Sequence, residues 1–121
     1  VLMRAGVAPA NGMQGQNIAD IVLGGRPSSH DCVIVEQQTS RPYLGMSTQM
    51  RIRTMTDGRW RMSVWEGAPF GELYDLESDP GEIVNLWGDP AHVGTRRALA
   101  ERMLWKMIEL QDRSPFPVGE A

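Results

Sequence analysis

The chain of 121 residues has few of the features that would cross-link it, anchor it in a membrane or hold a metal. Its single cysteine, Cys32, excludes an intrachain disulfide and a metal site built on a cysteine cluster. A run of about 18 apolar residues, which a membrane-spanning helix needs, is absent. Residues 1–4 also lack the long apolar core of a signal peptide, and we expect the chain to begin at a cut. The sequence assigns no compartment.

An excess of positive charge is missing too. The chain has 12 Lys and Arg residues against 15 Asp and Glu residues, which gives a net charge of -3. A general nucleic-acid binder needs a surplus of basic side chains, so this balance argues against nucleic acid as a partner. Hydrophobic residues make up 41% of the chain, an ordinary share for a globular protein. The length suits one small domain with a modest core.

The most informative stretch is GELYDLESDPGEIVNLW at residues 71–87. Its first part, residues 72–76, has the short apolar pattern of a strand. The following Asp79-Pro80-Gly81 predicts a turn, in which Pro80 presets φ at the first central position and Gly81 takes a positive φ at the second. Leu86 and Trp87 then supply apolar anchors that return the chain to a core.

Taken in this order, the strand, the turn and the apolar anchors of residues 71–87 resemble the ELYDLxxDPxExxNL segment near the C-terminus of sulfatases, in the alkaline phosphatase-like superfamily of hydrolases. Residues 2–18 resemble the LLxLAGxxxPxxxxGxSLxPLL stretch of the same family, with Asn17 where Ser is usual. Residues 31–36 resemble its xxVFxE strand, and residues 50–65 resemble its RTDRYKLI hairpin, with departures such as Trp60 for Tyr.

The resemblance covers nearly the whole chain and implies a domain organisation. Residues 26–121 correspond to the C-terminal subdomain of sulfatases, and residues 1–25 to a remnant of the catalytic domain's end with a linker. The fold class is α+β, a small antiparallel sheet of about four strands with a long C-terminal helix packed on one face. The expected strands lie near residues 32–36, 50–55, 59–65 and 72–76.

Four arginines crowd the expected hairpin: Arg51, Arg53, Arg59 and Arg61. Asp57-Gly58 is a strong two-residue turn signal, and such a turn places Thr56 opposite Arg59. Because side chains alternate across a strand, Arg59 and Arg61 then share one face, and Arg51 and Arg53 share the other. The four could form an anion-binding rim, but a solvated or ion-paired set is the interpretation that this geometry favours.

The C-terminal segment has the pattern of a helix from Thr95 to Asp112. Asp89 can cap its first free amides, and Pro90 suits the first helical position. Apolar residues recur at spacings of three and four and predict a core-facing band made of Leu99, Met103, Met107 and Leu110, widened by Ala100, Leu104 and Ile108. The opposite side carries Arg97, Glu101, Arg102, Lys106 and Glu109.

The resemblance implies a chemistry that this chain cannot perform alone. Sulfatases hydrolyse sulfate esters with a formylglycine made from Cys or Ser in a C/S-x-P-x-R motif, and a divalent cation, usually calcium, binds the sulfate. Cys32 is followed by neither Pro nor Arg in register, so we expect a buried structural thiol. No Asp-Asp pair precedes a nucleophile. The chain therefore offers no catalytic residue, metal ligand or cofactor site, and calcium and formylglycine would belong to the parent enzyme.

Three residues are candidates for the substrate cleft of the parent: His30, Arg59 and Arg61. His30 precedes the first strand and could point to the cleft, although a loop histidine without a function is the simpler interpretation. The four tryptophans, Trp60, Trp65, Trp87 and Trp105, are expected to anchor the core or a domain interface.

The sequence thus predicts the C-terminal part of a sulfuric ester hydrolase, which supports the catalytic domain and substrate cleft and is catalytically incomplete alone. A related phosphonate or phosphodiester hydrolase, or a free-standing interaction and oligomerisation module, remains an alternative. The expected partner is the upstream catalytic domain of the same protein. Separated from it, the chain should form a symmetric homodimer anchored by Trp65, Trp87 and Trp105.

Overall fold

A computed structural model of the chain describes residues 2–8, 13, 18–25, 30–39 and 49–111. Predictions that concern Asn17 and Asp112 lie outside these residues. The chain divides into two units, one from residues 1–29 and 108–121 and the other from residues 30–107. The predicted boundary between residues 25 and 26 stays a prediction.

The first unit contains two short helical turns, η1 (Met3–Ala5) and α1 (Ala19–Val22). The second unit holds the strands and most of the long helix, so it carries the candidate site. None of the helices in the described part of the chain is both long and apolar enough to cross a membrane.

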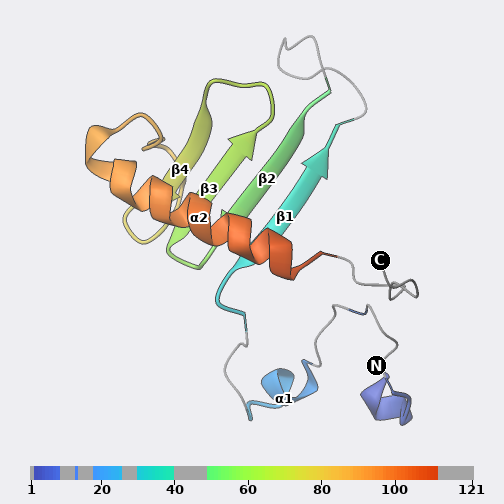
Figure 1. Ribbon diagram of the computed structural model, residues 1–121. Coiled ribbons are helices and arrows are strands. Elements are labelled where there is room, and N and C mark those ends of the chain that lie inside the picture. Colours follow the sequence, from blue (N-terminus) through green and yellow to red (C-terminus); the bar gives the residue numbers. More distant parts are fainter. Residues whose placement is uncertain (1, 9–12, 14–17, 26–29, 40–48, 112–121) are drawn as a thin grey trace. The chain divides into compact units, whose positions relative to one another are not determined.

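Four strands form one antiparallel sheet in the order β1-β2-β3-β4 (Figure 1). Their bounds are β1 (Val33–Gln38), β2 (Arg51–Thr56), β3 (Trp60–Trp65) and β4 (Gly71–Asp75). The 3-10 turn η2 (Pro90–His92) leads into α2 (Val93–Glu109), which lies across one face of the sheet. The predicted α+β class, the four antiparallel strands and the C-terminal helix are confirmed.

The core lies between the sheet and α2. Met55, Met62 and Leu73 sit on three neighbouring strands in register, because Met55 pairs with Met62 and Met62 pairs with Leu73. Against them pack Leu99 and Met103 of α2, with Cys32 at the margin of the same buried cluster. Burying a side chain of this size contributes about 1.5–3 kcal/mol, so this layer holds the helix on the sheet. Cys32 is buried as predicted.

The hairpin between β2 and β3 differs from the predicted register by two residues. Thr56 pairs with Arg61, not with Arg59, and the Asp57 amide donates to the Trp60 carbonyl across a turn whose central residues are Gly58 and Arg59. Gly58 has φ of 92°, a conformation that favours glycine. The Asp57 carboxylate accepts from the Arg59 and Trp60 amides, which fixes this turn in place of the expected Asp57-Gly58 pair.

The turn after β4 also differs from its prediction. The Glu82 amide donates to the Asp79 carbonyl over 3.0 Å, so Pro80 and Gly81 are the central residues. The residue with positive φ is Glu82, at 55°, and Gly81 lies outside the left-handed region. Pro80 and Gly81 therefore form a turn with a negative φ at both central positions. The positive φ falls on the next residue, Glu82.

The segment after this turn covers the outer edge of β4. Asn85 donates to the Gly71 carbonyl and accepts from the Leu73 amide, and the Leu86 amide donates to the Leu73 carbonyl. Trp87 packs against the core cluster beside Gly71, where a Cβ would lie 2.5 Å from its ring. The predicted return of Leu86 and Trp87 to the core is therefore confirmed. Trp87 is half-buried in this position.

The apolar band of α2 is narrower than predicted. Leu99 and Met103 are buried and Met107 packs against the core, whereas Ala100, Leu104 and Ile108 are exposed. Leu110 follows the end of the helix and is also exposed. The sheet covers one side of the helix, and the part of the band that turns away from the sheet keeps its contact with solvent.

Candidate functional site

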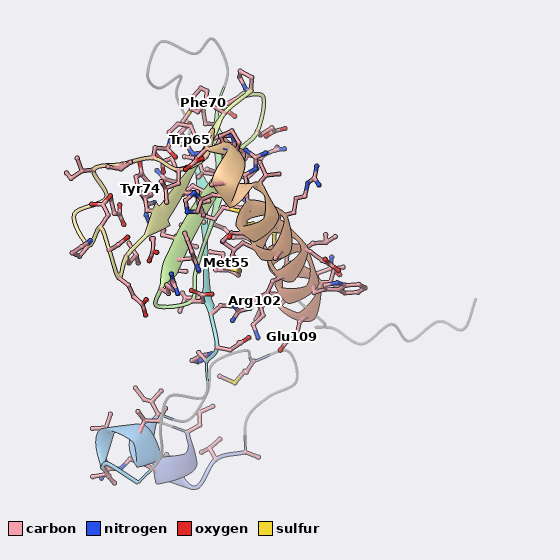
Figure 2. The ribbon with its side chains drawn as sticks, turned by 90° about the vertical axis from the view of Figure 1, so that its left-hand side faces the viewer. Met55, Trp65, Phe70, Tyr74, Arg102 and Glu109 are labelled. Carbon is pink, nitrogen blue, oxygen red and sulfur yellow. The ribbon has the colours of Figure 1, made fainter. Side chains whose placement is uncertain are left out.

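Arg61, a candidate cleft residue, is held by two carboxylates on the face of the sheet away from α2. Its Nε donates to Glu82 over 2.7 Å, and its Nη2 lies 2.7 Å from the second Glu82 oxygen and 3.4 Å from Glu72. The guanidinium also donates to the Ser63 hydroxyl and stacks on the Tyr74 ring at 4.9 Å. Tyr74 lies on the side of the sheet opposite α2 (Figure 2). The Arg61 charge is thus neutralised within the unit.

Arg59, the second candidate, occupies the hairpin turn and binds carboxylates of a different group. Its Nη2 lies 3.1 Å from Asp75, and its Nε lies 3.5 Å from Glu77. The Asp75 carboxylate raises the pKa of Arg59, and the hydrogen bond from Arg59 lowers the pKa of Asp75. Asp75 shares the face of Leu73 and the core, so Arg59 and Arg61 bind on opposite faces of the sheet. The prediction that they share one face is wrong. The turn is centred one residue later in the chain than expected, so Arg59 lies in the turn itself and not in β3.

All four hairpin arginines lie within ion-pair distance of acidic side chains. Besides the two above, Arg51 lies 3.6 Å from Glu66, and Arg53 lies 3.2 Å from Glu36. These ion pairs agree with the interpretation that the four arginines are structurally paired. The four guanidinium groups do not come together into one site for an anion. His30, the third candidate, is exposed in the segment before β1.

Among the residues that the structure describes, no group of three His, Cys, Asp or Glu side chains is arranged to hold a metal. Burial raises the pKa of the Cys32 thiol, and the nearby Asp31 charge adds to the effect. A raised pKa keeps the sulfur protonated at neutral pH, which is the opposite of what a nucleophile requires.

Arg102 of α2 binds Asp57 and Asp31, two residues outside the helix, and the sequence did not predict these contacts. Its Nη1 donates to the Asp57 carboxylate of the hairpin over 2.7 Å, and its Nη2 donates to the backbone carbonyl and carboxylate of Asp31 over 2.8 and 3.1 Å. Lys106 lies 3.6 Å from the same Asp31 side chain. Periodicity placed Arg102 and Lys106 on the solvent side, but both reach back from α2 to loops beside the sheet. Figure 2 shows Arg102 between the helix and the sheet.

The N-terminus of the helical segment is capped as predicted. The Asp89 carboxylate accepts from the Ala91 amide over 2.9 Å, and Pro90 opens η2. His92 is half-buried, lies 2.9 Å from Asp89 and packs against the Trp60 ring at a centroid distance of 5.9 Å. His92 therefore has a structural role at the start of the helical segment, between Asp89 and the Trp60 ring.

A groove of about 480 Å³ opens between α2 and the ends of β2 and β3. It is lined by apolar residues of both elements and by three charged residues: Val64, Trp65, Ala100, Met103, Leu104 and Met107, with Arg51, Arg53 and Glu66. In the strand register, the Trp65 side chain itself lies on the face of Ile52, away from Met62 and α2. Trp65 packs against Phe70 at 5.5 Å, and Figure 2 shows the two rings side by side. Within the described chain, two buried donors have no hydrogen-bond acceptor, Arg53 Nε and Trp65 Nε1.

Comparison with solved structures finds the same fold within larger hydrolases. A phosphonate monoester hydrolase of Agrobacterium radiobacter matches 93% of this chain with a TM-score of 0.77 and 24% identity. A putative sulfatase from Bacteroides thetaiotaomicron matches 90% with a TM-score of 0.76, and a 2-O GAG sulfatase matches 90% with a TM-score of 0.74, each at 24% identity. No protein-family model and no curated protein sequence matches the chain.

The match concerns only part of these proteins. The chain spans 23% of the length of the two sulfatases and 24% of the phosphonate monoester hydrolase. At this identity the likeness establishes the fold. The chain therefore has the fold of about a quarter of a sulfatase or phosphonate monoester hydrolase, as a C-terminal subdomain of that group would have.

Proposed function

We propose that the chain is the C-terminal part of a sulfuric ester hydrolase and that it supports the catalytic domain and the substrate cleft. The observation that carries the proposal is that the chain combines the sheet-and-helix fold of the matched hydrolases with the sulfatase-like sequence of residues 71–87. In that segment, Asn85 binds β4, Glu82 binds Arg61 and Asp75 binds Arg59. These side chains build the subdomain itself, and the chemistry would lie in the upstream part.

A phosphonate or phosphodiester hydrolase is the nearest alternative parent, since one of the matched structures is a phosphonate monoester hydrolase. Residues of the catalytic domain would separate the two activities. Calcium and formylglycine are proposed for the parent only, where upstream residues would bind the cation and supply the aldehyde.

Of the three cleft candidates, Arg59 and His30 fit a cleft-facing position better than Arg61. Each of the two arginines lies beside two carboxylates, but Arg59 keeps about half of its side chain exposed in the turn, at 52%, whereas Arg61 is 25% exposed. A partly exposed guanidinium in a turn can reach a bound anion, while the bidentate pair of Arg61 must first break.

The test is the product of the reading frame that extends upstream of Val1. We expect it to contain C/S-x-P-x-R at least about 250 residues earlier, the size of a catalytic domain, and to hydrolyse an aryl sulfate ester faster than an aryl phosphonate monoester. Residues 1–121 alone should show no turnover and no specific calcium binding. Preference for the phosphonate would assign the alternative parent, and turnover by residues 1–121 that Cys32→Ala abolishes would overturn the incomplete-site argument.

A free-standing interaction module is the second candidate, and the exposed Trp105 ring favours it, because such a ring in a self-sufficient module calls for a partner. Trp105 is 63% exposed on α2. In this case the chain would form a symmetric dimer through Trp65 and Trp105, and sedimentation at micromolar concentration would show a stable dimer. The gene would also contain no reading frame that extends upstream of residue 1.

A further inference from the structure

The two edges of the sheet end in different ways. At β4 the outer edge is covered, because the Asn85 side chain and the Leu86 amide bind the backbone of Gly71 and Leu73. At β1 the outer edge is open within the described part of the chain, since β2 is the only strand that pairs with β1. Figure 1 shows β1 at the margin of the sheet.

Three residues of β1 direct their backbone groups to this open edge. The amide of Thr39, which follows β1, donates to the Met50 carbonyl over 2.9 Å and so points toward β2. Backbone groups alternate in direction along a strand, so those of Gln38, Glu36 and Ile34 point away from β2. Among the residues that the structure describes, none supplies a hydrogen bond to these amides or carbonyls. The edge therefore offers a row of free donors and acceptors.

The sequence of β1, VIVEQQ, lacks the features by which proteins protect an exposed edge. It contains no Pro and no Lys, and its pairing with β2 continues without a bulge. Val33 and Val35 point to the face away from α2 and are 50% and 52% exposed. The one charged residue, Glu36, lies on the other face and pairs with Arg53 of β2. A regular, β-branched edge of this kind is suited to bind a further strand.

We propose that this edge binds the same edge of a second copy of the chain, antiparallel about a two-fold axis at Val35. In this register Ile34 of each copy lies opposite Glu36 of the other, and each such pair exchanges two backbone hydrogen bonds. Val35 lies opposite its own copy in a pair without hydrogen bonds, where side chains are closest and β-branched residues pack well. The inference goes beyond the proposed function, because it uses only β1 and holds for any parent enzyme.

The covered edge of β4 favours a second copy as the occupant. A strand from an unrelated sheet would bring another edge that stays open, whereas each copy of this chain ends at its own covered β4. The assembly then closes as a dimer. An axis at Glu36 would place the two Glu36 carboxylates directly opposite each other, which is destabilising. The axis at Val35 avoids this and keeps each Glu36 beside Arg53 of its own copy.

A disulfide across the axis is the first test. The Cα atoms of an antiparallel pair without hydrogen bonds lie about 4.5 Å apart, which a disulfide can span. Under mild oxidation, Val35→Cys should therefore form a covalent dimer of residues 1–121. Val33→Cys is the matched control on the same face of β1, and it should cross-link several-fold more slowly because Val33 lies opposite Gln37 of the second copy. The parent chain should not cross-link, since Cys32 is buried.

Sedimentation equilibrium of residues 1–121 is the second test. One short strand on each side makes a small interface, so the dimer should grow with concentration up to the millimolar range. Either V35K or V35E alone should abolish it, because like charges then lie directly opposite each other. An equal mixture of V35K and V35E should restore a dimer, and V33K should associate as the parent does. Circular dichroism checks that each variant stays folded, as expected for exposed positions.

Equal cross-linking of the two cysteine variants would contradict the register and overturn the proposal. A parent chain that stays monomeric at millimolar concentration would do the same, and so would a dimer that V35K leaves intact. The product of the longer reading frame gives the remaining check. If it is a monomer in which the Ile34 and Glu36 amides resist hydrogen exchange, the edge belongs to another strand of the same polypeptide and the proposal is wrong.

Discussion

Two residues of the segment 71–87, Gly71 and Glu82, hold its backbone in place through contacts with distant residues, which turn propensities do not predict. Gly71 begins β4 under the Trp87 ring, where a Cβ would lie 2.5 Å from the ring and 2.7 Å from the Ser63 carbonyl oxygen. Glu82 holds φ of 55° while its carboxylate makes a bidentate pair with Arg61. One residue is required for its small size and the other for its charge.

Gly71→Ala should destabilise the folded chain by about 1–3 kcal/mol, because the added methyl group must displace Trp87 or move β3. Gly88→Ala is the control, since no atom lies within 4 Å of the Cβ that it would add and its φ is outside the left-handed region. Urea unfolding monitored by tryptophan fluorescence measures both. Equal midpoints for the two variants would mean that Trp87 does not pack on Gly71 in solution.

Glu82→Gln should lower the free energy of unfolding by about 0.5–1 kcal/mol at low salt, the range for a partly exposed ion pair. The loss should shrink in 1 M salt, where the charges are screened. Gly81→Ala, one residue earlier, should be close to neutral, because Gly81 lies outside the left-handed region and its nearest neighbour is 3.5 Å from the added Cβ. A Gly81→Ala loss larger than the Glu82→Gln loss would restore the original assignment of the positive φ to Gly81.

At the scale of elements, Arg102 joins three pieces of the chain that are distant in sequence. It connects α2 with the hairpin turn through Asp57 and with the start of β1 through Asp31. Asp57 is 15% exposed at its side chain and also holds the Arg59 and Trp60 amides. The helix therefore contributes to the register of the hairpin, and the hairpin contributes to the position of the helix.

Arg102→Leu should destabilise the fold by about 1–2 kcal/mol, because it leaves the half-buried Asp57 carboxylate without its cation. Arg97→Leu is the matched control, with the same change at an exposed position of the same helix. Thermal unfolding followed by circular dichroism compares them. Hydrogen exchange of the Trp60 amide should quicken in Arg102→Leu alone, and an unchanged exchange rate would contradict the coupling between helix and hairpin.

At the scale of the whole molecule, three ion-paired or capping aspartates connect stability to pH: the exposed Asp31, the buried Asp75 and the half-buried Asp89. The pKa of Asp31 is lowered chiefly by its hydrogen bond from Arg102, that of Asp75 by Arg59, and that of Asp89 by the Ala91 amide and then by His92. A carboxyl whose pKa is lower in the folded than in the unfolded state stabilises the fold above the unfolded pKa of about 3.9. The contribution is lost as the pH falls through the folded value.

The free energy of unfolding should therefore be steady between about pH 5 and pH 8 and should decline below about pH 4. At the alkaline end, the raised pKa of Cys32 stabilises the fold below the unfolded thiol pKa of about 8.5, and this contribution is lost as the pH rises further. Urea titrations at pH 3, 4, 6 and 8 measure the profile. Asp31→Asn should flatten the acid limb, and a profile that stays level down to pH 3 would contradict the assigned shifts.

The sequence by itself determined the features that depend on neighbouring residues along the chain. Alternation and β-branched residues located four strands, Asp89 and Pro90 located the start of the helical segment, and the order of residues 71–87 indicated the fold class. Strands, caps and turns are governed by local sterics and hydrogen bonds, so a short window of sequence is enough to predict them.

Only the tertiary structure decided the features that need two distant segments at once. The hairpin register follows from an Asp57 carboxylate that binds its own turn and Arg102 of α2. The positive φ at Glu82 is held by Arg61 of a neighbouring strand. Helical periodicity marks every apolar residue of α2, but the width of the sheet decides that Met103 is covered and Leu104 is not. Such choices depend on which surfaces meet in space, and that information is absent from any single stretch of the chain.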